Sequence, residues 1–167
     1  MINRLCQTSL VAACALYMVL VVFNNLTDYG SNYQLVEHVL GMDTTFPGNS
    51  GMWRAIKNPV VYHVFYASII AWEAATAFLL SAGAWRLWQA RRASIPQWRN
   101  LRQWATAGLT LGMLLWFLAF ITVGGEWFLM WQSSKWNGLG PALRMFTVMA
   151  LVLLVLNLPE DCAAGQS

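Results

Sequence analysis

Charged residues are scarce in this chain. They make up 10% of its 167 residues, whereas hydrophobic residues make up 58%. An ordinary soluble protein has about 25% charged residues. A soluble domain of this size could not bury so much apolar surface away from water. In a membrane, apolar side chains can face lipid instead. The composition therefore excludes an ordinary soluble domain and favours a membrane protein.

Residues for metal, redox and nucleophilic chemistry are also few. The three cysteines form no CxxC pair, and the only histidines are His38 and His63. A zinc site needs three or four ligands, and no cluster supplies them. A haem would need His38 to fold back towards His63, or a methionine as second ligand. The chain has no phosphate-binding glycine loop, nucleophile elbow or HExxH motif. We therefore predict no metal, no cofactor and no catalytic residues, and favour a protein that is not an enzyme.

The net charge of +3 is unevenly distributed. Half of the ten basic residues lie in one stretch without acids: Arg86, Arg91, Arg92, Arg99 and Arg102. In a membrane protein such a cluster marks a cytoplasmic loop, here residues 85–102, rather than a surface for nucleic acid. With four spans, both termini are then expected in the cytoplasm.

Long apolar segments run over residues 5–26, 59–84, 104–124 and 141–158. Each reaches or approaches the roughly 20 residues that a helix needs to cross hydrocarbon. None alternates as a barrel strand would. We predict an all-α, polytopic membrane protein, a four-transmembrane-helix bundle in one domain over residues 1–167. Arg4 before the first segment also fits a signal peptide, but the chain stays apolar to Phe23, so an uncleaved helix is expected.

The first outer loop, residues 27–57, contains a helix signal of its own. Ser31 to Gln34 have the form of a capping box, and Leu35, Val36, Val39 and Leu40 follow at helical spacing. We predict a short amphipathic helix here.

Small and aromatic residues suggest how the helices sit in lipid. Gly108 and Gly112 form GxxxG, and Ala67, Ala71 and Ala75 form a small-residue stripe. Both patterns let helices approach closely, within one bundle or between copies. Tryptophans are expected in belts at the two membrane surfaces, with Trp85, Trp88, Trp98 and Trp104 on the inner side and Trp53, Trp127, Trp131 and Trp136 on the outer side.

The most informative polar residue is Glu73, near the middle of the second segment. A charge at that depth costs at least a few kcal/mol. Glu73 could carry a proton or bind a cation. Alternatively it is protonated and structural, with a hydrogen bond to Tyr17, which lies at similar depth, or to a backbone carbonyl.

A second polar group lies towards the outer ends of the segments. It comprises Asn24, Asn25, Asp28, His63, Glu126 and Arg144. One interpretation is an ion pair between Glu126 and Arg144. The other is an outward-facing polar pocket for a headgroup or a small anion.

One block carries a resemblance to a known family. The run from Gly124 to Ser133, followed by Trp136-Asn137-Gly138, resembles the strongest block of a bacterial family of predicted small integral membrane proteins with a domain of unknown function. The chain length, the four spans and the long first loop also resemble that family. The resemblance implies a bacterial inner membrane, and it brings no activity and no catalytic residues.

Three functions remain as hypotheses. The first is an accessory or scaffolding component, and the absence of a catalytic set favours it. The second is a small transporter or channel component using Glu73, although no inverted repeat or broken helix pair is visible. The third is a lipid- or quinone-binding redox subunit. Expected partners are the lipid bilayer and a second copy or a larger membrane complex, not nucleic acid.

Overall fold

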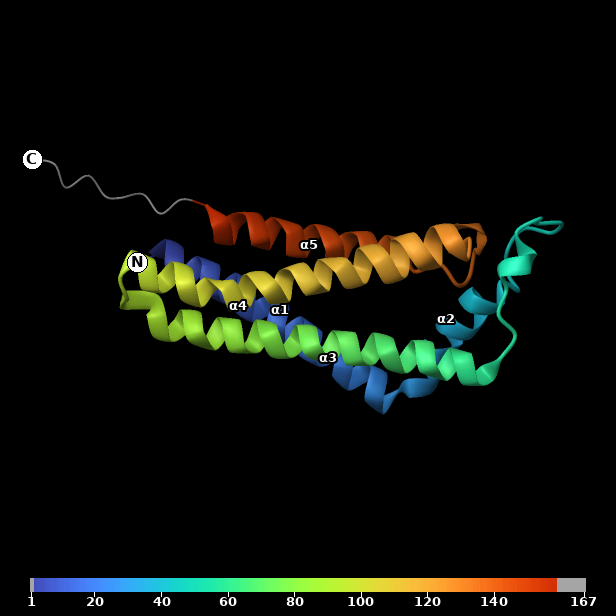
Figure 1. Ribbon diagram of the computed structural model, residues 1–167, viewed down its shortest axis with the longest axis horizontal. Helices are drawn as coiled ribbons and strands as arrows, with labels where there is room; N and C mark the ends of the chain where they lie inside the picture. The colour runs from blue at the N-terminus through green and yellow to red at the C-terminus, as the bar shows by residue number, and fades with distance from the viewer. Residues whose placement is uncertain (1, 159–167) are drawn as a thin grey trace, which may run out of the picture.

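The chain folds into long, roughly parallel helices (Figure 1). The computed structural model describes residues 2–158, and these contain no strand. The long helices are α1 (Ile2–Thr27), α3 (Pro59–Gln89), α4 (Ile95–Leu114) with its π-helical continuation η3 (Leu115–Trp127), and α5 (Leu139–Asn157). The short ones are α2 (Tyr29–Gly41) and the 3-10 turns η1 (Met52–Arg54), η2 (Ala90–Arg92) and η4 (Met130–Gln132). Four helices are long and apolar enough to cross a membrane, which confirms the predicted four-span bundle with a short helix in its first long loop.

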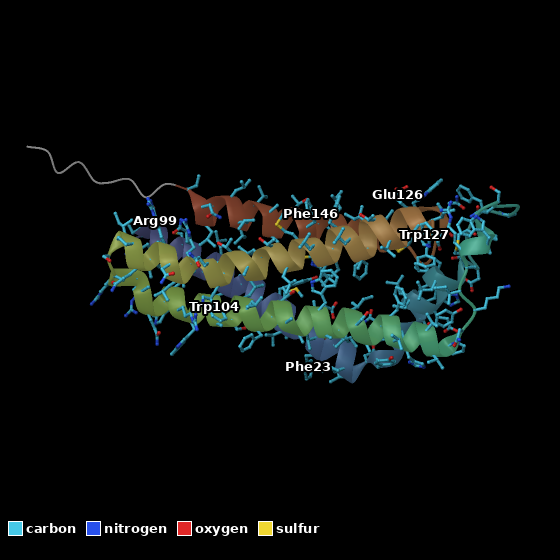
Figure 2. All side chains as sticks on the ribbon, viewed as in Figure 1. Phe23, Arg99, Trp104, Glu126, Trp127 and Phe146 are labelled. Atoms are coloured by element: carbon cyan, nitrogen blue, oxygen red, sulfur yellow. The ribbon has the colours of Figure 1, made fainter. Side chains whose placement is uncertain are left out.

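The four spans form a closed ring of contacts. Helix α1 packs on α3, α3 on α4, α4 on α5, and α5 on α1. The N-terminus and the α3–α4 connection lie at one end of the bundle, and α2 with the long loop lies at the other (Figure 1). We call these the arginine end and the loop end, because Arg99 lies at the first and Glu126 and Trp127 at the second (Figure 2).

Local sequence explains where α3 and α2 begin. The Asn58 side chain accepts a hydrogen bond from the Val60 N–H (2.9 Å), and Pro59 occupies the first helical position, where its missing N–H has no cost. Helix α2 starts earlier than the predicted capping box implies. Asp28 stands before its first residue, and the Ser31 hydroxyl donates to Asp28 Oδ1 (2.9 Å). The capping box is therefore not formed.

The basic stretch 85–102 is almost entirely helical, so the third long helix begins before Trp104, where the predicted apolar span begins. Helix α3 and turn η2 continue to Arg92, and α4 starts at Ile95. No glycine or proline interrupts residues 85–92 of α3 and η2, and Pro96 fits the first turn of α4. Hydropathy reports where lipid begins, not where a helix begins.

The tryptophans expected in the two belts divide into exposed and buried side chains. Trp53, Trp127 and Trp131 are exposed at the loop end, and Trp85, Trp88 and Trp104 at the arginine end. Trp136 is only partly exposed and stacks on His38, with 4.5 Å between ring centroids. Trp98 is fully buried, and the Arg4 guanidinium lies 4.9 Å from its ring centroid. Trp98 is therefore a core residue and not a belt residue. It lies in the first turn of α4, which begins at Ile95 and packs against the other helices.

The third long helix changes its winding at Leu115. From there to Trp127 it is a π-helix. The Phe128 N–H bonds to the Val123 carbonyl (3.0 Å), and the Thr122 hydroxyl to the Phe117 carbonyl (2.9 Å), both five residues back. The predicted helical span over 104–124 is therefore helical throughout but π-wound from Leu115 onwards. π-Helical segments are rare and frequently occur at functional sites.

Glycines allow the helices at the arginine end to touch through their backbones. A methyl group at Gly83 would lie 2.7 Å from the Ala105 Cα, and one at Gly108 would lie 2.9 Å from Leu80. Gly112 is buried in the same seam. The GxxxG pair therefore packs within the bundle. Such contacts bring dispersion energy, which drives helix association in lipid.

The alanine stripe behaves differently. Ala67, Ala71 and Ala75 are all exposed on α3. Packing within one bundle is therefore the wrong explanation for this stripe, because these positions face away from the neighbouring spans.

Candidate functional site

A polar cavity of about 240 Å³ lies in the loop-end half of the bundle. Its walls come from α1, α2, α3 and η3. Six polar side chains line it: Tyr17, Asn24, Asn25, Asn32, Tyr66 and Glu73. The remaining lining is apolar or aromatic: Val21, Leu35, Val36, Ile69, Trp116 and Phe120. Residues from all four elements thus converge on the carboxyl that the sequence singles out.

A chain of hydrogen bonds connects that carboxyl with the surface. Glu73 is 2% exposed and Asn25 is 7% exposed. Asn25 Nδ2 donates to Glu73 Oε2 (2.6 Å), and Asn32 Nδ2 donates to Asn25 Oδ1 (2.7 Å). Asn32 itself is exposed. The Tyr66 hydroxyl adds a long bond to the Asn25 carbonyl (3.4 Å). A buried carboxyl is expected to have such partners, because an unpaired one would be costly.

The partner of Glu73 differs from the one expected. Its carboxyl accepts a hydrogen bond from Asn25 and not from Tyr17. Tyr17 lines the same cavity and lies within electrostatic range of both Glu73 and Arg144. Helical spacing could have identified Asn25, since it follows Tyr17 by eight residues and so lies on the same face. The depth of a residue within its span, used by itself, had indicated Tyr17 as the partner of Glu73.

The predicted polar cluster divides into separate contacts. Asn24 lines the cavity, whereas Asp28 accepts the bond from Ser31 at the start of α2. His63 Nδ1 is 2.8 Å from the Tyr29 hydroxyl, and its ring stacks on Tyr33 at 4.4 Å between centroids. His63 thus belongs to an aromatic cluster beside the cavity.

The expected ion pair between Glu126 and Arg144 is wrong. Both side chains are exposed, and residues 2–158 contain no salt bridge between them. The expectation rested on both residues lying at the outer side of the membrane, and a shared depth does not bring two side chains together. The carbonyls of Glu126 and Trp127 instead accept hydrogen bonds from Arg54 (3.5 and 3.1 Å).

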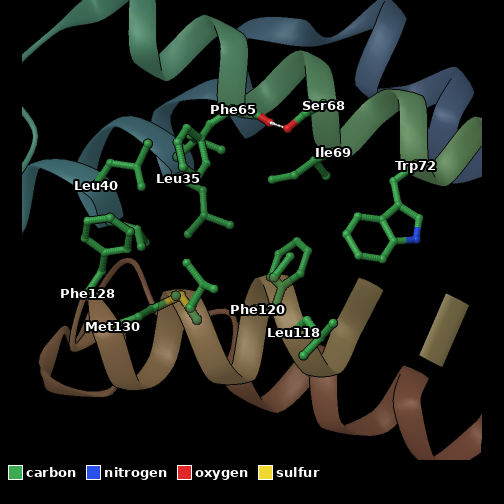
Figure 3. A pocket seen from close by; sticks show the side chains of 15 residues that line it. Leu35, Leu40, Phe65, Ser68, Ile69, Trp72, Leu118, Phe120, Phe128 and Met130 are labelled. Carbon is green, nitrogen blue, oxygen red and sulfur yellow. Dashed lines mark hydrogen bonds between the residues drawn. The ribbon is translucent and has the colours of Figure 1, made fainter. Parts of the chain in front are cut away.

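An apolar pocket of about 280 Å³ lies beside the polar cavity, between α2, α3 and η3 (Figure 3). Its few polar groups are already paired. The Ser68 hydroxyl donates to the Phe65 carbonyl (2.7 Å), and Trp72 Nε1 donates to the Leu111 carbonyl (3.0 Å). Four side chains line both hollows: Leu35, Val36, Ile69 and Phe120. Sequence reasoning missed this pocket, because it arises from the separation of α3 and η3.

One residue that lines the polar cavity carries a buried donor without a partner in residues 2–158. Trp116 is 6% exposed, and its Nε1 has no hydrogen-bond partner among the described residues. A buried donor without a partner calls for an explanation, such as a bound group or water. The aromatic ring also lies 4.9 Å from that of Phe120, centroid to centroid.

Other candidate chemistry is limited. Residues 2–158 contain no group of three or more His, Cys, Asp or Glu that could hold a metal ion. Cys6 is exposed and Cys14 is buried, and both are free thiols. Cys162 lies outside the described residues.

Comparison with known proteins identifies a family of membrane proteins. Residues 3–159 match the family described as predicted small integral membrane protein (DUF2165). The chain belongs to this family. The match confirms the resemblance noted for the block from Gly124 onwards, and it establishes an integral membrane protein. No curated protein and no solved structure matches the chain.

Proposed function

We propose that this family member is a non-catalytic membrane component that binds one apolar chain of a lipid-soluble amphiphile. The apolar pocket between α2, α3 and η3 is the observation that carries the proposal. An apolar hollow of this size does not hold water well, and its walls lack contacts until a chain fills it.

The mouth of the pocket supports a ligand that arrives through the bilayer. Phe65 and Leu118 are 37% and 40% exposed, and Ser68 is also exposed. These residues line the pocket from spans α3 and η3, where the surrounding solvent is lipid. Transfer from lipid brings no hydrophobic gain, so affinity has to come from packing.

The charge distribution supports an orientation for the binding site. Basic residues gather at the arginine end, and cytoplasmic loops are enriched in Lys and Arg. We infer that the arginine end faces the cytoplasm, that both termini lie there, and that the pocket belongs to the outer leaflet. A bacterial inner membrane fits this orientation.

An accessory or scaffolding role is compatible with a lipid-filled pocket, since a bound chain can complete a helix surface that a partner recognises. A transporter using Glu73 has less support. Between the polar cavity and the arginine end, Leu80, Leu87 and Leu109 are fully buried in a packed core, which offers no path for an ion across the bundle.

The proposal is tested with a photoreactive lipid. The purified protein is placed in liposomes of phosphatidylcholine that carries a diazirine in one acyl chain, and the labelled peptides are identified by mass spectrometry. We expect label on the pocket walls of α3 and η3, and at least a fivefold loss of it in Ser68→Phe.

Ala67→Phe is the matched control, because Ala67 is exposed on the same helix and does not line the pocket. It should leave the labelling pattern unchanged. Uniform labelling of all lipid-facing surfaces, unaffected by Ser68→Phe, would refute chain binding.

A further inference from the structure

We infer that the ligand is an isoprenoid quinone or its quinol, with the ring in the polar cavity and the tail in the apolar pocket. This inference rests on the proposed function and names the class of amphiphile. It concerns binding by Trp116 and Glu73 and assigns no reaction.

The two hollows are placed to hold the two ends of one molecule. They share a wall made of Leu35, Val36, Ile69 and Phe120. Their volumes, about 240 and 280 Å³, each exceed the space of a few waters. One hollow is lined half by polar side chains and the other almost entirely by apolar ones, so an amphiphile satisfies both when side chains of the shared wall rotate aside.

The hydrogen-bonding groups of the cavity match a ring that carries oxygens. Trp116 lines the cavity, and its indole N–H is buried without a partner among residues 2–158 and can donate only, so a quinone carbonyl accepts from it once the entering ring moves the side chains around it. Glu73 in its ionised form can only accept, and a quinol hydroxyl can donate to it. The Tyr17 hydroxyl, also in the lining, serves either form.

Charge argues against a phospholipid headgroup in the cavity. Among the described residues that line it, Glu73 is the one with a formal charge, and no Lys, Arg or His joins it. A phosphate would therefore meet a carboxyl without a cation. Glu73 also lies halfway along α3, at a depth where charged groups are costly.

Aromatic surfaces favour a flat, neutral ring. Tyr17, Tyr66, Trp116 and Phe120 all contribute to the lining. Aromatic rings stack readily on other flat rings, and each such pair adds to the energy of burial. A quinone ring meets these surfaces and carries no net charge.

The test uses competition against the photoreactive phosphatidylcholine. Decylubiquinone carries the ring on a saturated tail, and decanol has a similar tail without the ring. We expect decylubiquinone to halve the labelling of the apolar pocket at a concentration at least tenfold lower than decanol. Trp116→Phe should raise that concentration for decylubiquinone about fivefold, since it removes one hydrogen bond. It should leave the decanol value unchanged.

Trp98→Phe is the matched control. The Trp98 indole N–H is also buried without a partner in the described residues, but Trp98 lies in the core at the arginine end. This variant should leave unchanged the concentrations of decylubiquinone and of decanol that halve the labelling. Should Trp116→Phe fail to fold, Val21→Phe fills the polar cavity from α1, and Val19→Phe, at an exposed position outside the lining, is its control. Only Val21→Phe should make the concentration of decylubiquinone that halves the labelling as high as that of decanol.

The outcomes separate the two proposals. Equal competition by decylubiquinone and decanol, or no effect of Trp116→Phe and Val21→Phe on decylubiquinone, would overturn the quinone assignment and leave chain binding intact. Absence of specific labelling without any competitor would overturn chain binding, and this inference with it.

Discussion

The two halves of the bundle use the same four helices in opposite ways. At the arginine end, Gly83 and Gly108 let α3 and α4 touch, and side chains such as Leu80 and Leu109 are fully buried. At the loop end, Trp72 and aromatic residues of η3 line two hollows that remain between the helices. In lipid, where packing drives helix association, the presence of small residues decides where a bundle closes. The open half is where the buried carboxyl lies, so the difference directs attention to that half for binding.

The largest effect should come from breaking the closed half. Gly83→Val should destabilise the protein by about 3 kcal/mol, because its side chain would overlap the Ala105 backbone and neither helix can give way cheaply. Unfolding by a denaturing detergent in mixed micelles measures this loss. Gly140→Ala is the control, because no atom lies within 4 Å of a methyl group there. A cost for Gly83→Val no greater than that for Gly140→Ala would contradict the close packing.

The next effect probes the buried pair in the open half. Asn25→Leu removes the donor to Glu73 and should cost about 2 kcal/mol, since it leaves a buried polar group unpaired. Glu73→Gln should cost less than about 1 kcal/mol, because the amide oxygen can still accept from Asn25. The same unfolding measurement applies to both variants. If Glu73→Gln proved as damaging as Asn25→Leu, the hydrogen bond would not be the stabilising element.

Hydrogen exchange can sharpen the contrast along a single helix. Amides of η3 should exchange about tenfold faster than those of α4 residues 105–114, because the π-helical half borders the hollows and the α-helical half lies in the packed core. Exchange of the protein in lipid nanodiscs, read by mass spectrometry of peptides, gives both rates at once. Equal protection in the two halves would mean that η3 is held as firmly as α4.

The smallest effect should come from the exposed charges at the loop end. Arg144→Ala and Glu126→Gln should each change stability by less than about 0.5 kcal/mol, and the double variant should show the sum, because the two side chains form no ion pair. A double-mutant cycle by detergent unfolding tests this. A coupling energy above about 1 kcal/mol would restore the ion pair.

Features that depend on the chain locally could be predicted from the sequence. Long apolar runs required four spans, since every backbone group in lipid must be paired within its own helix. The apolar spacing after Tyr33 required a short amphipathic helix, and Asn58-Pro59 marked the start of α3. That Glu73 has a hydrogen-bond partner also followed from its position, because a carboxyl in the middle of a span needs one.

Features that depend on distances between helices were decided only by the tertiary structure. Asn25 rather than Tyr17 became the partner of Glu73, and Trp98 entered the core instead of a belt. The π-helical winding of η3 and the two hollows beside it have no clear local signal, because they result from how far the large side chains hold neighbouring helices apart. The sequence by itself determined how many helices are long and apolar enough to cross a membrane, and the packing between them determined where hollows remain in the bundle.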